Sequence, residues 1–276
     1  MKIAVCWKWV SLDREREADR RWSGVSAADE SALEVALTIA ECWHGEVTIV
    51  CLGPPSADDV LRDAIAVGAT SAIRVDASTE LDSRVVAVAL AEQLRDQDLV
   101  LCGDYSLDRG TGSVPAFLAD ELSSAQALGL LEVHPNDGAS TTRSLRVVRR
   151  LDGGRREILE VTPPAVLSVE GSAANLRRAS LAATLDARAV PVVSVSGPHG
   201  RLPEAEIHPY RPRARVLRAP TGGSLDRVRQ ILDVGGGDVH AELITLDPPA
   251  AASRILDQLR AWGYLDAATS SSTESA

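Results

Sequence analysis

The sequence predicts an α/β protein built on a parallel β-sheet with helices on both faces. Four short runs of valine, isoleucine and leucine alternate with three segments of helical apolar spacing, as in sheets that are buried on both sides. Strand followed by helix is also the order of right-handed βαβ units. The chain has 276 residues, 45% of them hydrophobic, which suits one large or two modest domains with a buried core.

The first four strands and the first helix follow from local patterns. The strand runs cover residues 3–9, 46–52, 72–75 and 99–103. Residues 28–43 carry apolar side chains on one helical face. Ser26 and Asp29 have the spacing of a capping box and therefore mark the beginning of this helix.

Two more helices are predicted between these strands. Ser56 with Asp59 has the spacing of a helix cap, and Gly68 suits the end of the same helix. Thr79 with Asp82 has the same spacing at the beginning of the next helix.

The pattern changes after about residue 126, where strand-like runs follow one another without long helices. These runs lie at residues 128–134, 145–151, 157–161 and 165–169. Residues 152–154, Asp-Gly-Gly, are a hairpin signal. We expect an antiparallel section that extends the sheet, followed at residues 171–188 by a loop and a short helix.

The domain boundary is predicted at residue 188. Residues 1–188 form the α/β domain, and residues 189–266 form an extended C-terminal arm that is rich in proline, arginine and glycine in its first part. The arm contains two short amphipathic helices, at residues 224–234 and 250–263. Because it has no apolar core of its own, we expect it to wrap a partner subunit or to lie on its own domain. Residues 267–276 are expected to be disordered.

Composition excludes several classes of protein. A net charge of −10 argues against nucleic acid and anionic membranes as partners, and no apolar run reaches transmembrane length. The N-terminus enters a strand directly without a signal peptide, which favours a cytoplasmic location. The histidines do not cluster, so we expect neither a metal site nor a catalytic triad. The cysteines lack CxxC spacing and are expected to be buried free thiols: Cys6, Cys42, Cys51 and Cys102.

Residues 98–119 are the most informative stretch for function. An apolar strand ends at Gly103, a loop of Gly, Asp, Ser and Thr follows, and a helix begins near Val114. Helix N-termini preceded by glycine-rich loops bind phosphate, although this loop is neither a Walker motif nor GxGxxG. An ordinary turn between a strand and a helix is the alternative. Because ligands bind at the carboxyl ends of parallel strands, residues 6–8, 52–54 and 103–112 are expected to line one crevice.

Three segments resemble the β subunit of electron transfer flavoproteins. The most specific is residues 147–168, which matches the family signature: a basic residue, an acidic-glycine turn, an acidic residue, and Pro-Pro before a strand. The second comprises the opening βαβαβ units with the Asp-Glu-x-Ala-Leu-Glu run at residues 29–34, and the third is the loop at residues 103–114. The resemblance covers roughly residues 1–190 well. The chain also resembles a bacterial subgroup associated with mycofactocin-dependent alcohol oxidation.

The resemblance implies an adenine-nucleotide-binding α/β fold and an electron carrier rather than an enzyme, with no catalytic residues. In the family, an αβ heterodimer carries electrons from a dehydrogenase to a quinone reductase or another acceptor. The α subunit holds most of the FAD, and the β subunit usually carries a structural AMP. Bifurcating relatives carry a second FAD in the β subunit, which is one alternative here. A stand-alone nucleotide-binding sensor of the same fold is another.

The family's nucleotide contacts transfer to strand ends and to the loop that follows the fourth strand. The residues implied are Cys6, Lys8, Ser26, Leu52, Gly53, Gly103, Asp108, Arg109, Gly110, Thr111, Gly112, Ser113 and Val114. Arg109, Ser113 and Pro115 depart from the usual family loop, so AMP and FAD both stay open. Ser26 could serve only as a helix cap, and Cys6 could be a core thiol.

The family's docking loop for dehydrogenases matches residues 177–181. Leu181 is the implied anchor, with Arg177 and Ser180 beside it. Arg178 and Ala182 stand where the family usually has Tyr and Pro, which predicts a different dehydrogenase from those typical of the family. Alternatively, Leu181 packs on its own helix.

Overall fold

The structure, a computed structural model, describes residues 1–12, 21–78, 81–136, 143–198, 221–232 and 244–264. The chain divides into two units, Met1–Ile207 and His208–Ala276. Residues 13–20, Thr79, the tail at 267–276 and much of the predicted arm lie outside the described residues.

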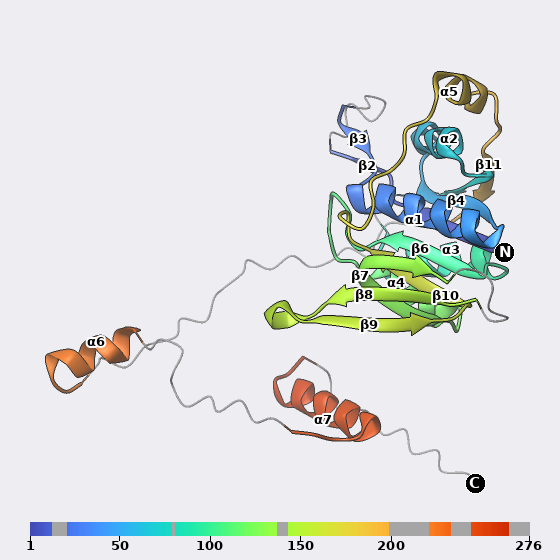
Figure 1. Ribbon diagram of the computed structural model, residues 1–276. Coiled ribbons are helices and arrows are strands. Elements are labelled where there is room, and N and C mark those ends of the chain that lie inside the picture. Colours follow the sequence, from blue (N-terminus) through green and yellow to red (C-terminus); the bar gives the residue numbers. More distant parts are fainter. Residues whose placement is uncertain (13–20, 79–80, 137–142, 199–220, 233–243, 265–276) are drawn as a thin grey trace, which may run out of the picture. The chain divides into compact units, whose positions relative to one another are not determined.

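Within its described residues, the first unit is a nine-stranded sheet covered by helices on both faces (Figure 1). In sheet order the strands are β11 (Val193–Ser196), β5 (Ser71–Asp76), β4 (Glu46–Gly53), β1 (Lys2–Trp7), β6 (Leu99–Gly103), β10 (Ala165–Val169), β7 (Ala125–Pro135), β8 (Leu145–Arg150) and β9 (Arg156–Val161). Neighbours from β11 to β7 pair in parallel, and β8 and β9 pair antiparallel. The predicted α/β fold class is confirmed.

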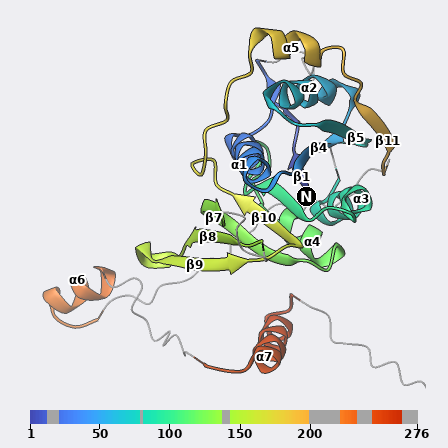
Figure 2. The same ribbon diagram turned by 45° about the vertical axis from the view of Figure 1, so that its right-hand side comes forward.

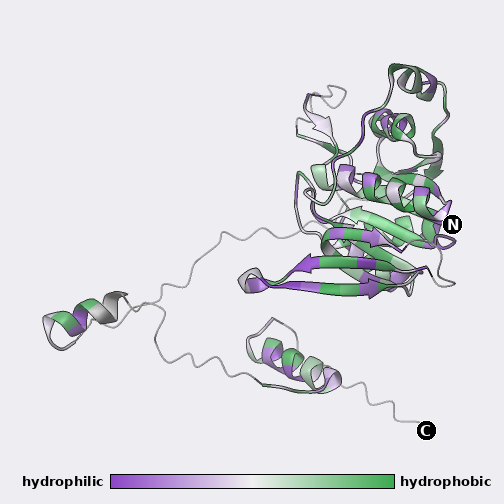
Figure 3. Cartoon of the chain, in the orientation of Figure 1, coloured by the Kyte–Doolittle hydropathy of each residue, from purple (hydrophilic) through white to green (hydrophobic). Residues whose placement is uncertain are grey.

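The helices divide between the two faces of the sheet (Figure 2). The helices of this unit are α1 (Ala27–Trp43), α2 (Asp58–Val67), α3 (Ser83–Leu94), α4 (Val114–Glu121) and α5 (Leu181–Ala187). Side chains of β1 alternate between two cores: Ile3 and Val5 pack with α1 and α2, and Ala4 and Cys6 pack with α3 and α4. This alternation follows from the two-residue period of a strand. Figure 3 shows the apolar character of the inner elements and the mixed character of the outer strands.

The helix boundaries confirm the caps predicted at Ser26 and Gly68 and correct those predicted at Ser56 and Thr79, since α3 begins at Ser83 with Asp82 as its cap. Ser26 and Asp29 form the capping box of α1, and Gly68, with φ 140°, ends α2. Asp82 caps α3 by accepting hydrogen bonds from the amides of Arg84 and Val85. The prediction for Ser56 was wrong because a 3₁₀ turn at Pro55–Ala57 precedes α2, which begins without a side-chain cap.

β10 corrects the predicted antiparallel section. It lies between β6 and β7 and pairs in parallel with both, whereas only the β7–β8–β9 meander is antiparallel. The reason is burial: every residue of β10 is buried, and a continuous apolar run is typical of a strand inside a parallel sheet.

β11 lies within the segment that the sequence predicted as arm. It pairs in parallel with the edge strand β5. The Arg74 guanidinium, which is almost fully buried, donates to Ser194 Oγ at 3.0 Å and also binds Asp58 and Asp76. One buried cation therefore ties β11 to the sheet.

The second unit contains α6 (Ser224–Leu232) and α7 (Pro248–Ala261). Asp247 caps α7 by accepting from the amide of Ala250. Large apolar side chains are exposed on this unit, among them Leu225, Val228, Ile255, Leu256 and Trp262. None of the helices in the described part of the chain has the length and apolar character needed to cross a bilayer.

Candidate functional site

A cavity of about 280 Å³ opens at the carboxyl ends of β1, β4 and β6. Its wall also includes the loop after β6 and the beginnings of α3 and α4. This is where open α/β sheets bind ligands. The structure therefore brings together the three strand ends that the sequence predicted to meet.

The loop after β6 turns at two glycines with left-handed backbones. Gly110 has φ 60° and Gly112 has φ 59°. A Cβ atom on Gly112 would lie 2.4 Å from the carbonyl oxygen of Asp104, whereas at Gly110 the nearest atom is the Ser106 carbonyl oxygen at 3.6 Å. Position 112 therefore requires glycine both for its backbone angle and for space.

α4 begins directly after this loop, beside two hydroxyl groups. Thr111 Oγ1 and Ser113 Oγ lie 3.0 Å apart. Ser113 does not cap the helix with its side chain, and Pro115 stands in the first turn, where its missing N–H costs nothing. An uncapped helix N-terminus next to two hydroxyls is suited to bind an anion.

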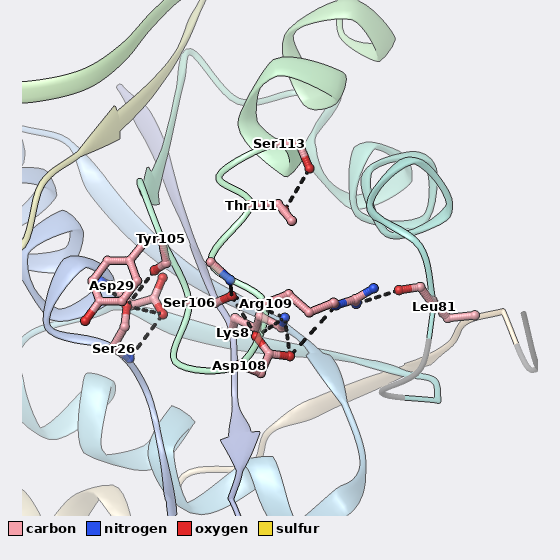
Figure 4. A network of polar contacts seen from close by, with 11 residues as sticks. Lys8, Ser26, Asp29, Leu81, Tyr105, Ser106, Asp108, Arg109, Thr111 and Ser113 are labelled. Carbon is pink, nitrogen blue, oxygen red and sulfur yellow. Dashed lines mark hydrogen bonds and ion pairs between the residues drawn. The ribbon is translucent and has the colours of Figure 1, made fainter. Parts of the chain in front are cut away.

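An ion pair links the end of β1 to the loop (Figure 4). Lys8 Nζ donates to both carboxylate oxygens of Asp108, at 2.6 and 2.7 Å. Ser106 Oγ donates to Asp108 at 2.7 Å and accepts from the Gly110 amide at 3.3 Å. Burial by itself raises the pKa of Asp108. Hydrogen bonds from Lys8 and Ser106 outweigh this effect and lower the pKa to about 2. The loop is therefore held by an ionised carboxylate.

Arg109 holds the other side of the loop. Its Nη2 donates to the Leu81 carbonyl oxygen at 2.7 Å, just before α3 (Figure 4). The Arg109 guanidinium thus joins the loop after β6 to the segment that leads into α3. Its remaining N–H groups give the cavity a cationic group that can bind a phosphate.

Asp29 is a buried carboxyl group in the cavity wall. It accepts from Ser26 Oγ at 2.9 Å and from the Ser26 amide at 3.3 Å, while the backbone amides of Lys8 and Gly103 also bind it. Burial raises its pKa to about 7, because desolvation outweighs these hydrogen bonds. Ser26 Oγ also donates a hydrogen bond to the Tyr105 carbonyl oxygen at 3.1 Å. Ser26 and Asp29 together therefore join α1 to the ends of β1 and β6.

Most of the predicted nucleotide residues lie in the cavity wall. These are Cys6, Lys8, Leu52, Gly103, Asp108, Arg109, Thr111, Gly112, Ser113 and Val114. Ser26, Gly53 and Gly110 do not line it. Ser26 acts on the wall through Asp29 and Tyr105, and Gly110 through the turn of the loop.

Sequence reasoning missed several lining residues. Trp9, Ser78 and Ser83 are among them. Ser78 follows β5, so the rule that ligands lie at the carboxyl ends of parallel strands could have found it. Trp7, which was expected at the crevice, is held there by a hydrogen bond from its Nε1 to the Asp29 carbonyl oxygen at 2.7 Å.

Of the three predicted docking residues, Leu181 is exposed, whereas Ser180 and Arg177 form contacts within the chain. Leu181 begins α5 and is 77% exposed, so it does not pack on its own helix. Ser180 caps α5 by accepting from the Ala183 amide. Arg177 turns inward, where it binds Glu34 Oε1 at 2.8 Å and also pairs with Glu41. The structure therefore gives Arg177 a contact within its own chain.

No cluster of three or more potential metal ligands occurs among the residues that the structure describes. The site offers backbone amides, hydroxyl groups, a guanidinium and apolar walls. Such an arrangement binds an anionic, partly apolar molecule.

Comparisons with known proteins agree with this architecture. A family model described as the electron transfer flavoprotein domain matches residues 18–198, more than half of the chain. Protein FixA of Rhizobium meliloti is 31% identical over 219 residues, covering 75% of this chain and 74% of that protein. The electron transfer flavoprotein subunit beta of Syntrophomonas wolfei is 29% identical over 208 residues, covering 71% and 80%. With Protein FixA of Azorhizobium caulinodans, 31% identical over 178 residues, the match covers 61% of this chain and 62% of that protein.

The parallel sheet and its domain match define an electron transfer flavoprotein domain. The chain belongs to the beta-subunit family of electron transfer flavoproteins, as the sequence resemblance predicted. Several of these relatives are named as beta subunits of electron transfer flavoproteins. The narrower resemblance to mycofactocin-associated proteins stays a prediction.

Proposed function

We propose that this chain is the β subunit of a heterodimeric electron transfer flavoprotein and holds an adenosine phosphate, AMP or FAD, in the cavity at its strand ends. The observation that carries the proposal is the Gly112 turn. It leads into the uncapped beginning of α4 beside Thr111 and Ser113, with Arg109 at the same wall. Amides, hydroxyls and a guanidinium together suit a phosphate group.

The size of the cavity favours AMP over FAD. A volume of about 280 Å³ lies just under the roughly 300–1,000 Å³ that is usual for ligand pockets. A mononucleotide fits that size better than a dinucleotide. The AMP phosphate would lie against Thr111, Ser113 and Arg109, and the apolar walls at Leu52 and Val86 suit the base.

Electron transfer itself belongs to a flavin held mostly by the α subunit, which receives electrons from a dehydrogenase and passes them to a quinone reductase or another acceptor. The flavin supplies the redox chemistry, and this chain supplies binding and orientation. The exposed apolar side chains of α6 and α7 are the proposed contact with the α subunit.

Small molecules released from the denatured heterodimer test this function. The chain is co-expressed with its α subunit, and the released nucleotides are identified by mass spectrometry. We expect one AMP and one FAD for each pair of subunits. Two FAD molecules would instead establish the bifurcating type, and a stable yellow monomer without the α subunit would reject the pairing.

Leu181 is the proposed anchor for the dehydrogenase. Replacing Leu181 with Ala should slow electron transfer from the dehydrogenase to the heterodimer by roughly tenfold, because an exposed anchor at an interface contributes about 1–2 kcal/mol. Flavin content should stay the same. Val88, another exposed apolar residue, provides the matched control as Val88→Ala. Equal transfer rates in the two variants would remove Leu181 from the docking surface.

A further inference from the structure

Two thiols lie side by side in the wall of the cavity. Cys6 on β1 and Cys102 on β6 are register partners in adjacent parallel strands, and both line the cavity. Their side chains point to the same face, toward α3 and α4. The Cys102 thiol forms a hydrogen bond with Cys6. All four cysteines of the chain are free, and Cys51 belongs to the core on the opposite face of the sheet.

The spacing of the strands suits a bridging atom better than a disulfide. Adjacent strands lie about 4.8 Å apart, and paired side chains in a parallel sheet keep about that separation. A disulfide requires Cβ atoms about 3.8 Å apart. One atom placed between the sulfurs relieves this mismatch, because it links them without pulling the strands together.

The Cys102 thiol is protonated at neutral pH. The hydrogen bond with Cys6, together with burial, raises the pKa of Cys102 well above its usual value. Reagents that require a thiolate are therefore slow at Cys102. A ligand whose leaving group takes up the thiol proton does not need a thiolate at Cys102 and is favoured over such reagents.

We propose that Cys6 and Cys102 form a two-thiol site in the cavity wall for a thiophilic ligand of the trivalent arsenic class. With phenylarsine oxide, each sulfur forms one bond to arsenic, the arsenic–oxygen bonds break, and the oxygen leaves with both thiol protons as one water molecule. No oxidant or reductant takes part. Because the pair lines the cavity, the bound arsenical and a nucleotide exclude each other, a consequence that rests on the proposed function.

The test uses the full chain freed of bound nucleotide, with phenylarsine oxide as the probe and native mass spectrometry as the readout. We expect one adduct per chain, and the thiols that react after denaturation should fall from four to two. Cys6→Ala and Cys102→Ala should each weaken binding on the order of a hundredfold, because the second sulfur binds as part of the same molecule. Cys42→Ala and Cys51→Ala are the matched controls and should bind like the unmodified chain.

Three results overturn the proposal: no adduct on the nucleotide-free chain, an adduct that survives loss of Cys6 or Cys102, or one that depends on Cys51. Circular dichroism checks that each variant is folded. The thiol count is measured on the unmodified chain, so it tests the proposal even if a variant does not fold. Added AMP should slow adduct formation. If AMP has no effect while the adduct forms on Cys6 and Cys102, the thiol site stands and the proposed nucleotide site fails.

Discussion

Gly112 shows how one backbone position shapes the candidate site. Its left-handed backbone and the nearby Asp104 carbonyl oxygen leave no room for a side chain. The family resemblance implied this glycine as a nucleotide contact, and the structure adds that a side chain here would collide with the Asp104 carbonyl oxygen. Gly110 has nearly the same backbone angle but more open surroundings, so the two glycines separate the effect of strain from that of crowding.

Replacing Gly112 with Ala should lower nucleotide content and stability more than replacing Gly110 with Ala. Both variants lose about 1–2 kcal/mol because alanine must adopt a left-handed backbone, and only Gly112→Ala also meets an atom at 2.4 Å. Urea unfolding and the AMP dissociation constant measure the two effects. Equal losses in both variants would show that crowding at position 112 is irrelevant.

Asp29 links stability to pH with a sign opposite to that of Asp108. Its pKa in the folded protein, about 7, lies above the ordinary value of 3.8. Folding therefore favours the protonated form of Asp29. The stability that this form contributes is lost as pH rises from about 4 through 7. Asp108, with a pKa of about 2, contributes stability above pH 4 and loses it as pH falls toward 2.

Asp29→Asn should remove the part of the pH dependence that Asp29 causes. The free energy of unfolding of the variant, relative to that of the unmodified chain, should increase between pH 5 and pH 8 by up to a few kcal/mol. Urea titrations at both pH values measure it, with Asp82→Asn, at an exposed helix cap, as the control. If the free energy of unfolding changed by the same amount between pH 5 and pH 8 in Asp29→Asn and in the unmodified chain, the raised pKa of Asp29 would be contradicted.

Among the elements, the segment before α5 depends on one arginine. Arg177 binds Glu34 through its backbone amide and its guanidinium and also pairs with Glu41, so it fastens this segment across α1. Ala174 adds a hydrogen bond from its amide to Ser31 Oγ at 3.0 Å. These contacts hold Leu181 in its exposed position.

Arg177→Gln should loosen this segment, whereas the same change at the exposed Arg178 should not. A partly exposed ion pair contributes about 1 kcal/mol, which corresponds to roughly fivefold faster local hydrogen exchange. Exchange measured over residues 172–187 provides the readout. Identical exchange in the two variants would mean that Arg177 does not position Leu181.

The elements also show how far the sequence predicts the fold. Runs such as residues 99–103 predicted strands well because burial on both faces leaves a clear apolar pattern. The sequence did not reveal the order of the strands around β10, because an apolar run is the same whether its neighbours are parallel or antiparallel. β11 was missed because its residues are mostly exposed and carry serines. Its pairing depends on Arg74, which is far away in the sequence.

In the whole molecule, the sheet and the C-terminal helices have different roles. The first unit contains both buried cores and the whole cavity. The described side chains of α6 and α7 are exposed or only partly buried. The candidate site could be located from the sequence because it belongs to local strand ends, whereas side chains such as Trp9 reach it only through tertiary packing.

A chain that ends at residue 198 should fold and bind AMP but should no longer co-purify with the α subunit. The reason is that it keeps both cores and loses the exposed apolar helices. Isothermal calorimetry and flavin absorbance of the purified material measure the two properties. As a finer control, Ile255→Glu in the full chain should weaken pairing without affecting AMP binding. Full co-purification of the shortened chain would contradict the proposed wrapping.

The central place of β10 has a consequence for how the protein reaches its native state. β10 joins the part of the sheet from β11 to β6 to the β7–β9 meander. Except for β11, all the strands that it joins come before it in the sequence. During synthesis, β6 and β7 therefore emerge one after the other, but neither has its partner on this side until residues 165–169 arrive and pair with both. Non-local pairing of this kind is slow, and until it is complete the nascent chain presents two open strand edges, which we expect to be its period of greatest exposure to aggregation and to chaperones.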